Sequence, residues 1–92
     1  MKIFVRPKHI RKGKRGSSRL CPIALAVKER TGLKHLDVGD SVTFSWYSEI
    51  EARLPVKARD FVQRFDEGKS VKPFSFVISD KKIQAARDLA SA

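Results

Sequence analysis

A chain of 92 residues, of which 41% are hydrophobic and 33% are charged, has the balance of a folded globular chain and not of a disordered one, and we expect one domain with one modest core and no separate catalytic domain. The single cysteine, Cys21, cannot form an internal disulfide, nothing at the start resembles a signal peptide, and no apolar run approaches the ~20 residues of a membrane span. We therefore expect a cytoplasmic protein without a membrane partner. Its formal net charge of +10 favours a negatively charged binding partner.

The N-terminal segment combines a short strand with a basic stretch. Residues 3–5 predict a strand that ends at Arg6-Pro7, because proline has no N–H to donate to a sheet. Residues 8–12 are compatible with one helical turn. Residues 14–18 contain the glycine, serines and cations of a flexible basic loop.

The clearest helix signal covers residues 22–31. Pro22 suits the first helical position, which places Cys21 at the cap, and Gly32 suits the position just past the end. Apolar residues at i, i+3, i+4 and i+7 predict one buried stripe, made by Leu20, Ile23, Ala24 and Val27.

Two alternating segments follow a connection over residues 33–40. In residues 41–47 and again in residues 50–54, hydrophobic and polar residues alternate with a period of two, which is typical of half-buried strands. Because so few residues separate the two segments, we expect them to form an antiparallel hairpin.

The C-terminal half predicts one more helix and one more strand. The helix runs from Pro55 to the residue before Gly68, and the strand covers residues 74–78. The order β-α-β-β-α-β predicts an α+β fold with one small, mostly antiparallel sheet and two helices on one of its faces. We expect residues 1–79 to form a single domain and residues 80–92 to form a tail that is either helical or frayed.

Positive charge is concentrated in the first nineteen residues, which contain eight Lys or Arg and no acidic residue. Arginine and lysine donate hydrogen bonds to phosphates, and basic segments most often meet a polyanion, which in a cytosol is usually nucleic acid. The candidate residues for contact with nucleic acid or an acidic partner are Arg6, Lys8, Arg11, Lys12, Lys14, Arg15 and Arg19. The alternative is a solvated basic arm that has no partner.

Aromatic side chains that could stack on a base are scarce near these cations. Between Arg6 and Arg19 the only ring is that of His9. In the predicted hairpin, the alternation places Tyr47 on the face opposite Trp46, so Tyr47 is a candidate for stacking. The alternative is that Tyr47 is an ordinary half-exposed strand residue.

Catalytic and metal-binding signatures are missing. A thiolate at Cys21 would be stabilised by the helix start and by Arg19, but a nucleophile also needs a base, and only His9 and His35 are available. We expect Cys21 to be a small cap residue that packs under its helix. One cysteine and two separated histidines do not make a metal site. We therefore predict no catalytic residue, no metal and no cofactor.

Two stretches of the chain share a pattern with a known group of proteins. The first is K-G-x-R-G from Lys12 to Gly16, followed by C-P-I-A-L-A over residues 21–26. The second contains Leu54-Pro55, Ala58, Phe61-Val62, Phe65-Asp66, Gly68, Val71, Pro73-Phe74 and Phe76. Together they cover most of residues 8–78, and they resemble a family of small uncharacterised proteins encoded by tailed bacteriophages and prophages.

The resemblance implies a phage origin and a location in the bacterial host cytosol, but it brings no biochemical activity. This chain is more basic than is usual in that family, and residues 79–92 lie outside the resemblance. The first functional hypothesis is a non-enzymatic phage accessory protein that binds nucleic acid through its basic N-terminal segment. The alternative is a phage-encoded inhibitor that docks on a host protein or nucleoprotein complex, as an anti-defence protein would.

Overall fold

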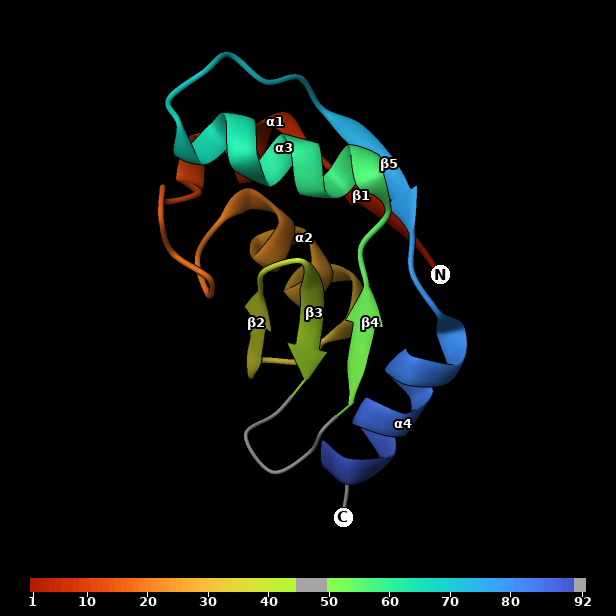
Figure 1. Ribbon diagram of the computed structural model, residues 1–92. Coiled ribbons are helices and arrows are strands. Elements are labelled where there is room, and N and C mark those ends of the chain that lie inside the picture. Colours follow the sequence, from red (N-terminus) through yellow and green to blue (C-terminus); the bar gives the residue numbers. More distant parts are fainter. Residues whose placement is uncertain (45–49, 91–92) are drawn as a thin grey trace.

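The computed structural model describes residues 1–44 and 50–90, and these ranges contain five strands and four helices (Figure 1). In chain order the elements are β1 (Lys2–Val5), α1 (Pro7–Lys12), α2 (Pro22–Thr31), β2 (Leu36–Val38), β3 (Ser41–Phe44), β4 (Glu51–Arg53), α3 (Val56–Asp66), β5 (Phe74–Val77) and α4 (Asp80–Ala90). The predicted α+β class is confirmed.

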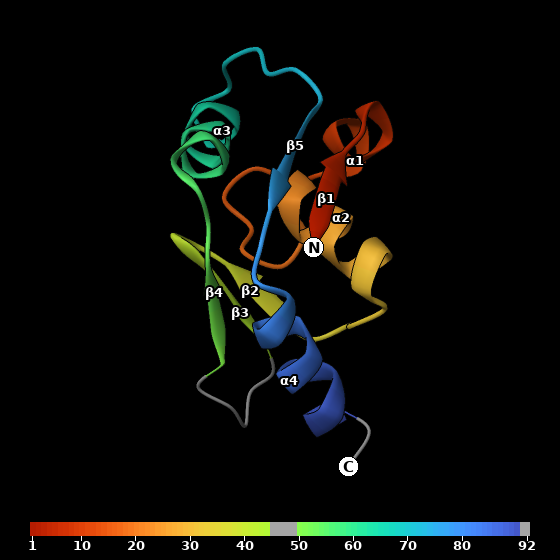
Figure 2. The ribbon, with the colours of Figure 1, turned by 90° about the vertical axis from the view of Figure 1, so that its right-hand side faces the viewer.

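The first sheet pairs β1 with β5, the first and last strands of the chain, in antiparallel fashion. Ile3 lies opposite Phe76, and both side chains are buried, as alternation along a strand requires for the inward face. Lys2 and Phe4 point to the other face and are exposed. In Figure 2 this two-stranded ribbon lies between α3 on one side and α1 and α2 on the other.

The second sheet is an antiparallel meander in the order β2-β3-β4. The β3–β4 hairpin agrees with the predicted pairing of the two alternating segments. Strand β2 corrects the sequence analysis, which assigned residues 33–40 to a connection. Leu36 and Val38 are buried on either side of the partly exposed Asp37, so the strand alternation is present but covers only three residues.

The strands therefore form two sheets where the sequence predicted one. The order of elements along the chain does not contain the information on which strand edges meet. Strand β4 is only three residues long, and Leu54-Pro55 follows it and leads the chain into α3. Because proline has no N–H to donate to a ladder, β4 ends before Pro55, and β1 pairs with β5 in a separate sheet.

Helix α2 has the bounds that the sequence predicts. The thiol of Cys21 caps its start by accepting the N–H of Ala24 at 3.5 Å. Gly32 ends it in the left-handed conformation, with φ at 77°, and donates its N–H to the carbonyl of Lys28. The predicted apolar stripe is buried except for Leu20, which lies before the helix and is 40% exposed.

The remaining helices complete one shared core. Phe61 of α3 packs against Phe74 of β5, with ring centroids 4.8 Å apart. Helix α4 buries Ile83 and Ala86, and the guanidinium of Arg87 donates to the carbonyl of Thr31 at the end of α2. Residues 80–90, for which the sequence left a helix or a frayed tail open, thus form a helix.

Within the described ranges, no helix is both long and apolar enough to cross a lipid bilayer.

Candidate functional site

The basic segment begins with α1, which gathers three of the predicted cations. Lys8, Arg11 and Lys12 occupy positions i, i+3 and i+4 of the helix, so they share one face, and all three are exposed. His9 lies on the other side and is buried, with 5% of its surface accessible. The N–H of Gly13 donates to the carbonyl of His9 at 2.8 Å and closes the helix.

His9 joins α1 to α2. Its Nδ1 accepts the N–H of Arg6 at 2.9 Å, which assigns the proton of the neutral ring to Nε2, and Nε2 donates to Oε2 of Glu29 at 3.0 Å. The ammonium of Lys8 lies 3.0 Å from the same oxygen. Hydrogen bonds from His9 and then from Lys8 lower the pKa of the Glu29 carboxyl below its ordinary value. A carboxylate on α2 therefore holds α1 in place.

Residues 13–21 form a loop that is closed by its own hydrogen bonds. Lys14 donates its N–H to the carbonyl of Leu20 at 2.8 Å, and Cys21 donates to the carbonyl of Ser17 at 3.1 Å. The hydroxyl of Ser17 also accepts the N–H of Leu20. The sequence predicts a flexible loop here, and in the structure the Ser17 hydroxyl and the backbone groups of this loop hydrogen-bond to one another.

One end of this loop is docked on the C-terminal end of α3. Gly16 has φ at 68°, a conformation that favours glycine, and donates its N–H to Oδ1 of Asp66 at 2.9 Å. A methyl group added to Gly68 would stand 3.5 Å from the guanidinium of Arg15, so the Arg15 cation lies against the backbone just after α3. A cation at this end of a helix is favoured by the helix dipole.

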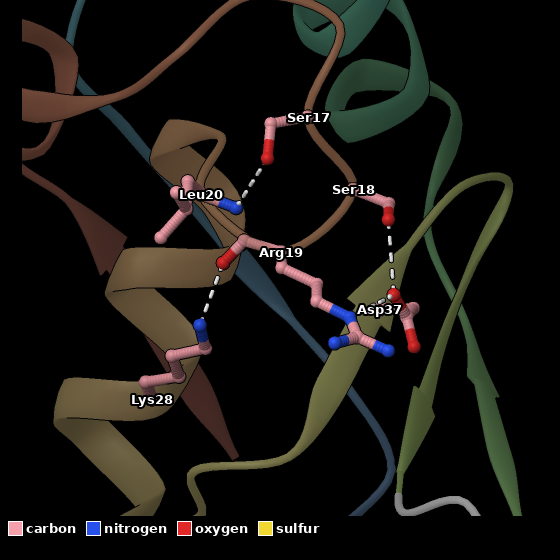
Figure 3. A network of polar contacts seen from close by, with 6 residues as sticks. All are labelled: Ser17, Ser18, Arg19, Leu20, Lys28 and Asp37. Atoms are coloured by element: carbon pink, nitrogen blue, oxygen red, sulfur yellow. Dashed lines mark hydrogen bonds and ion pairs between the residues drawn. The ribbon is translucent and has the colours of Figure 1, made fainter.

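The other end of the loop is tied to β2 and α2 (Figure 3). The hydroxyl of Ser18 donates to Oδ1 of Asp37 at 2.9 Å, and Nε of Arg19 donates to the same oxygen at 3.2 Å. The hydrogen bond from Ser18, supported by Arg19, lowers the pKa of Asp37. The ammonium of Lys28 donates to the backbone carbonyl of Arg19 at 2.6 Å. The loop is thus tied to β2 by side-chain contacts and to α2 by a contact with its backbone.

The predicted cations are all exposed or partly exposed, but they differ in what they contact. Lys8 and Arg19 form ion pairs with acidic side chains of α2 and β2. Within the part of the chain that the structure describes, Arg11, Lys12 and Lys14 form no ion pair. The structure therefore leaves a run of uncompensated positive charge at the end of α1 and the start of the loop.

An exposed aromatic ring that the sequence analysis missed lies beside these cations. Phe4 of β1 is 43% exposed. The guanidinium carbon of Arg6 lies 5.2 Å from its ring centroid, and the ammonium of Lys2 lies 5.5 Å from it. The signal was present in the sequence, because alternation along a strand places Phe4 on the same face as Lys2 and Arg6.

Tyr47 and Cys21 are the other two residues that the sequence singles out. Tyr47, proposed for stacking, lies outside the described residues. Cys21 is buried, and burial raises the pKa of its thiol above its ordinary value, so the thiol is protonated near neutral pH. It acts as the cap of α2, in the packing role that the sequence predicts, and the two ring nitrogens of His9 are engaged by Arg6 and Glu29.

No group of three or more His, Cys, Asp or Glu side chains that could hold a metal ion occurs in the described part of the chain.

Comparison of the sequence and structure with protein families, with curated proteins and with solved structures found no significant match. The resemblance to bacteriophage proteins thus stays a prediction.

Proposed function

We propose that this chain is a non-enzymatic phage accessory protein that binds nucleic acid in the bacterial cytosol, with the surface of α1 and the loop after it contacting phosphates. The observation that carries the proposal is the uncompensated charge of Arg11, Lys12 and Lys14 on a helix and a loop that are closed by their own backbone hydrogen bonds. Cations on a fixed surface lose less conformational entropy on binding than cations on a disordered arm.

The arrangement of the acidic residues supports a polyanion as the partner. Glu29 and Asp37 each hold a structural contact, the first under α1 and the second under the loop. They neutralise Lys8 and Arg19 in part while leaving the neighbouring cations unpaired. A surface that needed only solubility would not require its cations to be gathered in one segment, since evenly spread charge is equally effective.

The proposal is tested with a variant that removes the uncompensated cations, Arg11→Gln/Lys12→Gln/Lys14→Gln. The matched control is Lys57→Gln/Lys72→Gln/Lys82→Gln, which removes three exposed lysines from α3, α4 and the connection before β5. Each variant lowers the net charge from +10 by three to +7. Arg15 is left intact because its guanidinium packs against Gly68.

Binding to labelled DNA and RNA is measured by fluorescence anisotropy across a salt series. If each removed cation contacts one phosphate of a duplex, the slope of log affinity against log salt falls by about 2.7 in the α1 and loop variant. The control variant should keep the slope of the unmodified protein. Equal losses in both variants would show that only net charge matters and would overturn the proposed surface.

An acidic or nucleoprotein partner in the host, as the inhibitor hypothesis requires, gives a different result. Affinity purification from bacterial lysate would then recover one dominant protein that stays bound after nuclease treatment. The unmodified protein would show no affinity for free DNA or RNA even at about 50 mM salt, where phosphate contacts are strongest. That pair of results would replace nucleic acid by protein as the direct partner.

A further inference from the structure

The outer face of the β1–β5 ribbon carries an aromatic ring next to the cationic segment. Phe4 lies opposite Ser75, and Lys2 lies opposite Val77, so these four residues share the face that is turned away from the core. Phe4 is 43% exposed and Val77 is 64% exposed, whereas Ile3 and Phe76 on the other face are buried.

Positive charge surrounds the Phe4 ring. The ammonium of Lys2 and the guanidinium of Arg6 lie 5.5 Å and 5.2 Å from its centroid, and both side chains are exposed. Contacts of this kind at an exposed site are weak, so a flat ligand can displace them. A displaced Lys2 or Arg6 side chain would stay within reach of a phosphate attached to that ligand.

An open hollow of about 290 Å³ adjoins the ring. Its walls are Phe4, Arg6, His9, Ala26, Glu29 and Arg30. The half-exposed carboxylate of Glu29 is a hydrogen-bond acceptor that an exocyclic amino group of a base can reach, and Arg30 adds a further cation. An aromatic platform, an acceptor and several cations are the groups that recognise a nucleotide.

From this juxtaposition we infer that the ligand of the basic surface is a single-stranded nucleic acid, and that a base stacks on Phe4 while Lys2, Arg6 and the cations of α1 hold the flanking phosphates. The inference rests on the proposed function and specifies its substrate class. A duplex already stacks its bases on one another, so it cannot offer a base face to Phe4, whereas an unpaired strand can.

The test compares Phe4→Leu, which keeps an apolar side chain but removes the ring, with Phe4→Tyr, which keeps the ring. Val56→Ala is the matched control, because Val56 is 70% exposed at the start of α3. The probes are a labelled oligothymidine and a mixed-sequence DNA duplex of the same length, measured by anisotropy at about 50 mM salt. Thermal unfolding confirms that each variant is folded.

We expect Phe4→Leu to weaken binding of the single strand about tenfold and to change binding of the duplex less than about twofold. Phe4→Tyr and Val56→Ala should bind both probes as the unmodified protein does. If Phe4→Leu binds the single strand as tightly as the unmodified protein, while Arg11→Gln/Lys12→Gln/Lys14→Gln weakens both probes, the stacking inference is overturned and the phosphate surface stands. If the unmodified protein binds neither probe, the proposed function fails, and the stacking inference fails with it.

Discussion

Oε2 of Glu29 accepts a hydrogen bond from Nε2 of His9 at 3.0 Å, and this contact fixes the helix that carries the cationic surface. His9 is buried, whereas the Glu29 side chain is half exposed. The same carboxylate pairs with Lys8, one of the predicted binding residues. A single acidic side chain on α2 therefore positions α1 and also sets how much positive charge α1 presents to solvent.

Stability should depend on pH through Glu29. Hydrogen bonds from His9 and then Lys8 depress the pKa of this carboxyl in the folded state. A group with a depressed pKa stabilises the fold above its unfolded pKa of about 4.3 and loses that contribution as pH falls through the lower, folded value. We expect Glu29→Gln to unfold at a lower temperature than the unmodified protein at pH about 7, with the difference shrinking below pH about 4.

The control for this measurement is Glu51→Gln. Glu51 is an exposed carboxylate on β4 and forms no ion pair with any residue in the described ranges. Its substitution should leave the melting temperature nearly unchanged at both pH values. A Glu29→Gln variant that melts like the Glu51→Gln variant at neutral pH would contradict the role assigned to Glu29.

The junction of α1 with the loop should tolerate no side chain at Gly13. A Cβ at this position would stand 2.6 Å from Cδ and Cγ of Pro22, which is closer than packed carbons approach. We expect Gly13→Ala to lower the free energy of unfolding by about 1–3 kcal/mol, as overpacking does. The φ of Gly13 is −67°, so alanine adds no backbone strain, and the loss reports the clash after the small gain from the lower entropy of the unfolded chain is subtracted.

Gly39→Ala is the matched control in a urea-unfolding series. No atom lies within 4 Å of the position that its Cβ would take, and its φ is not positive. This variant should be as stable as the unmodified protein or slightly more so, because alanine reduces the entropy of the unfolded chain. Equal stability of Gly13→Ala and Gly39→Ala would show that Pro22 does not hold α1 and α2 close together.

Local signals were sufficient to predict much of the fold. The bounds of α2 could be predicted because a cap residue, a proline and a terminal glycine lie at the spacing of a helix around an apolar stripe. The pairing of β1 with β5 could not be predicted, because these strands are the first and the last of the chain. They come together only when the segments between them fold into the shared core. Strand β2 was missed because three residues are too short for the period of two to stand out.

The cationic surface could also be predicted only in part. The charge of residues 6–19 was visible in the sequence, but the pairing of Lys8 and Arg19 was not, because their carboxylate partners lie on other elements. The buried position of His9 and its bond to Glu29 also depend on packing between helices. Composition therefore located the cations, and only the tertiary structure separates those in ion pairs from the others.

Cys21 should be slow to react in the folded protein. The thiol is 3% exposed, and burial raises its pKa, so both access and the thiolate fraction are reduced. We expect labelling by iodoacetamide to be at least about tenfold slower in buffer than in urea that unfolds the chain. The comparison needs a small thiol such as glutathione as a reference for the effect of urea. Labelling of the folded protein at the rate of the unfolded chain would contradict the burial of this side chain.

Removal of the charge of Asp37 should strengthen nucleic-acid binding. In an Asp37→Asn variant, the amide oxygen of the new side chain can still accept the hydrogen bond from the Ser18 hydroxyl, so the loop stays tied to β2, but Arg19 loses its ion pair. Because the ion pair of Arg19 and Asp37 is exposed, its loss should cost at most about 1 kcal/mol of stability. We expect affinity for single-stranded DNA at about 50 mM salt to rise about 2- to 10-fold, as one more cation becomes available to a phosphate.

The matched control is Asp88→Asn, which removes an exposed carboxylate from α4 and raises the net charge from +10 by one to +11, as Asp37→Asn does. If long-range attraction by net charge were the cause, both variants would gain equally. A gain confined to Asp37→Asn, with a steeper salt dependence, would place Arg19 among the residues that contact phosphate. Weaker binding by Asp37→Asn would mean that the carboxylate aligns Arg19 for the ligand, because the loss of a competing charge alone cannot reduce affinity for a polyanion.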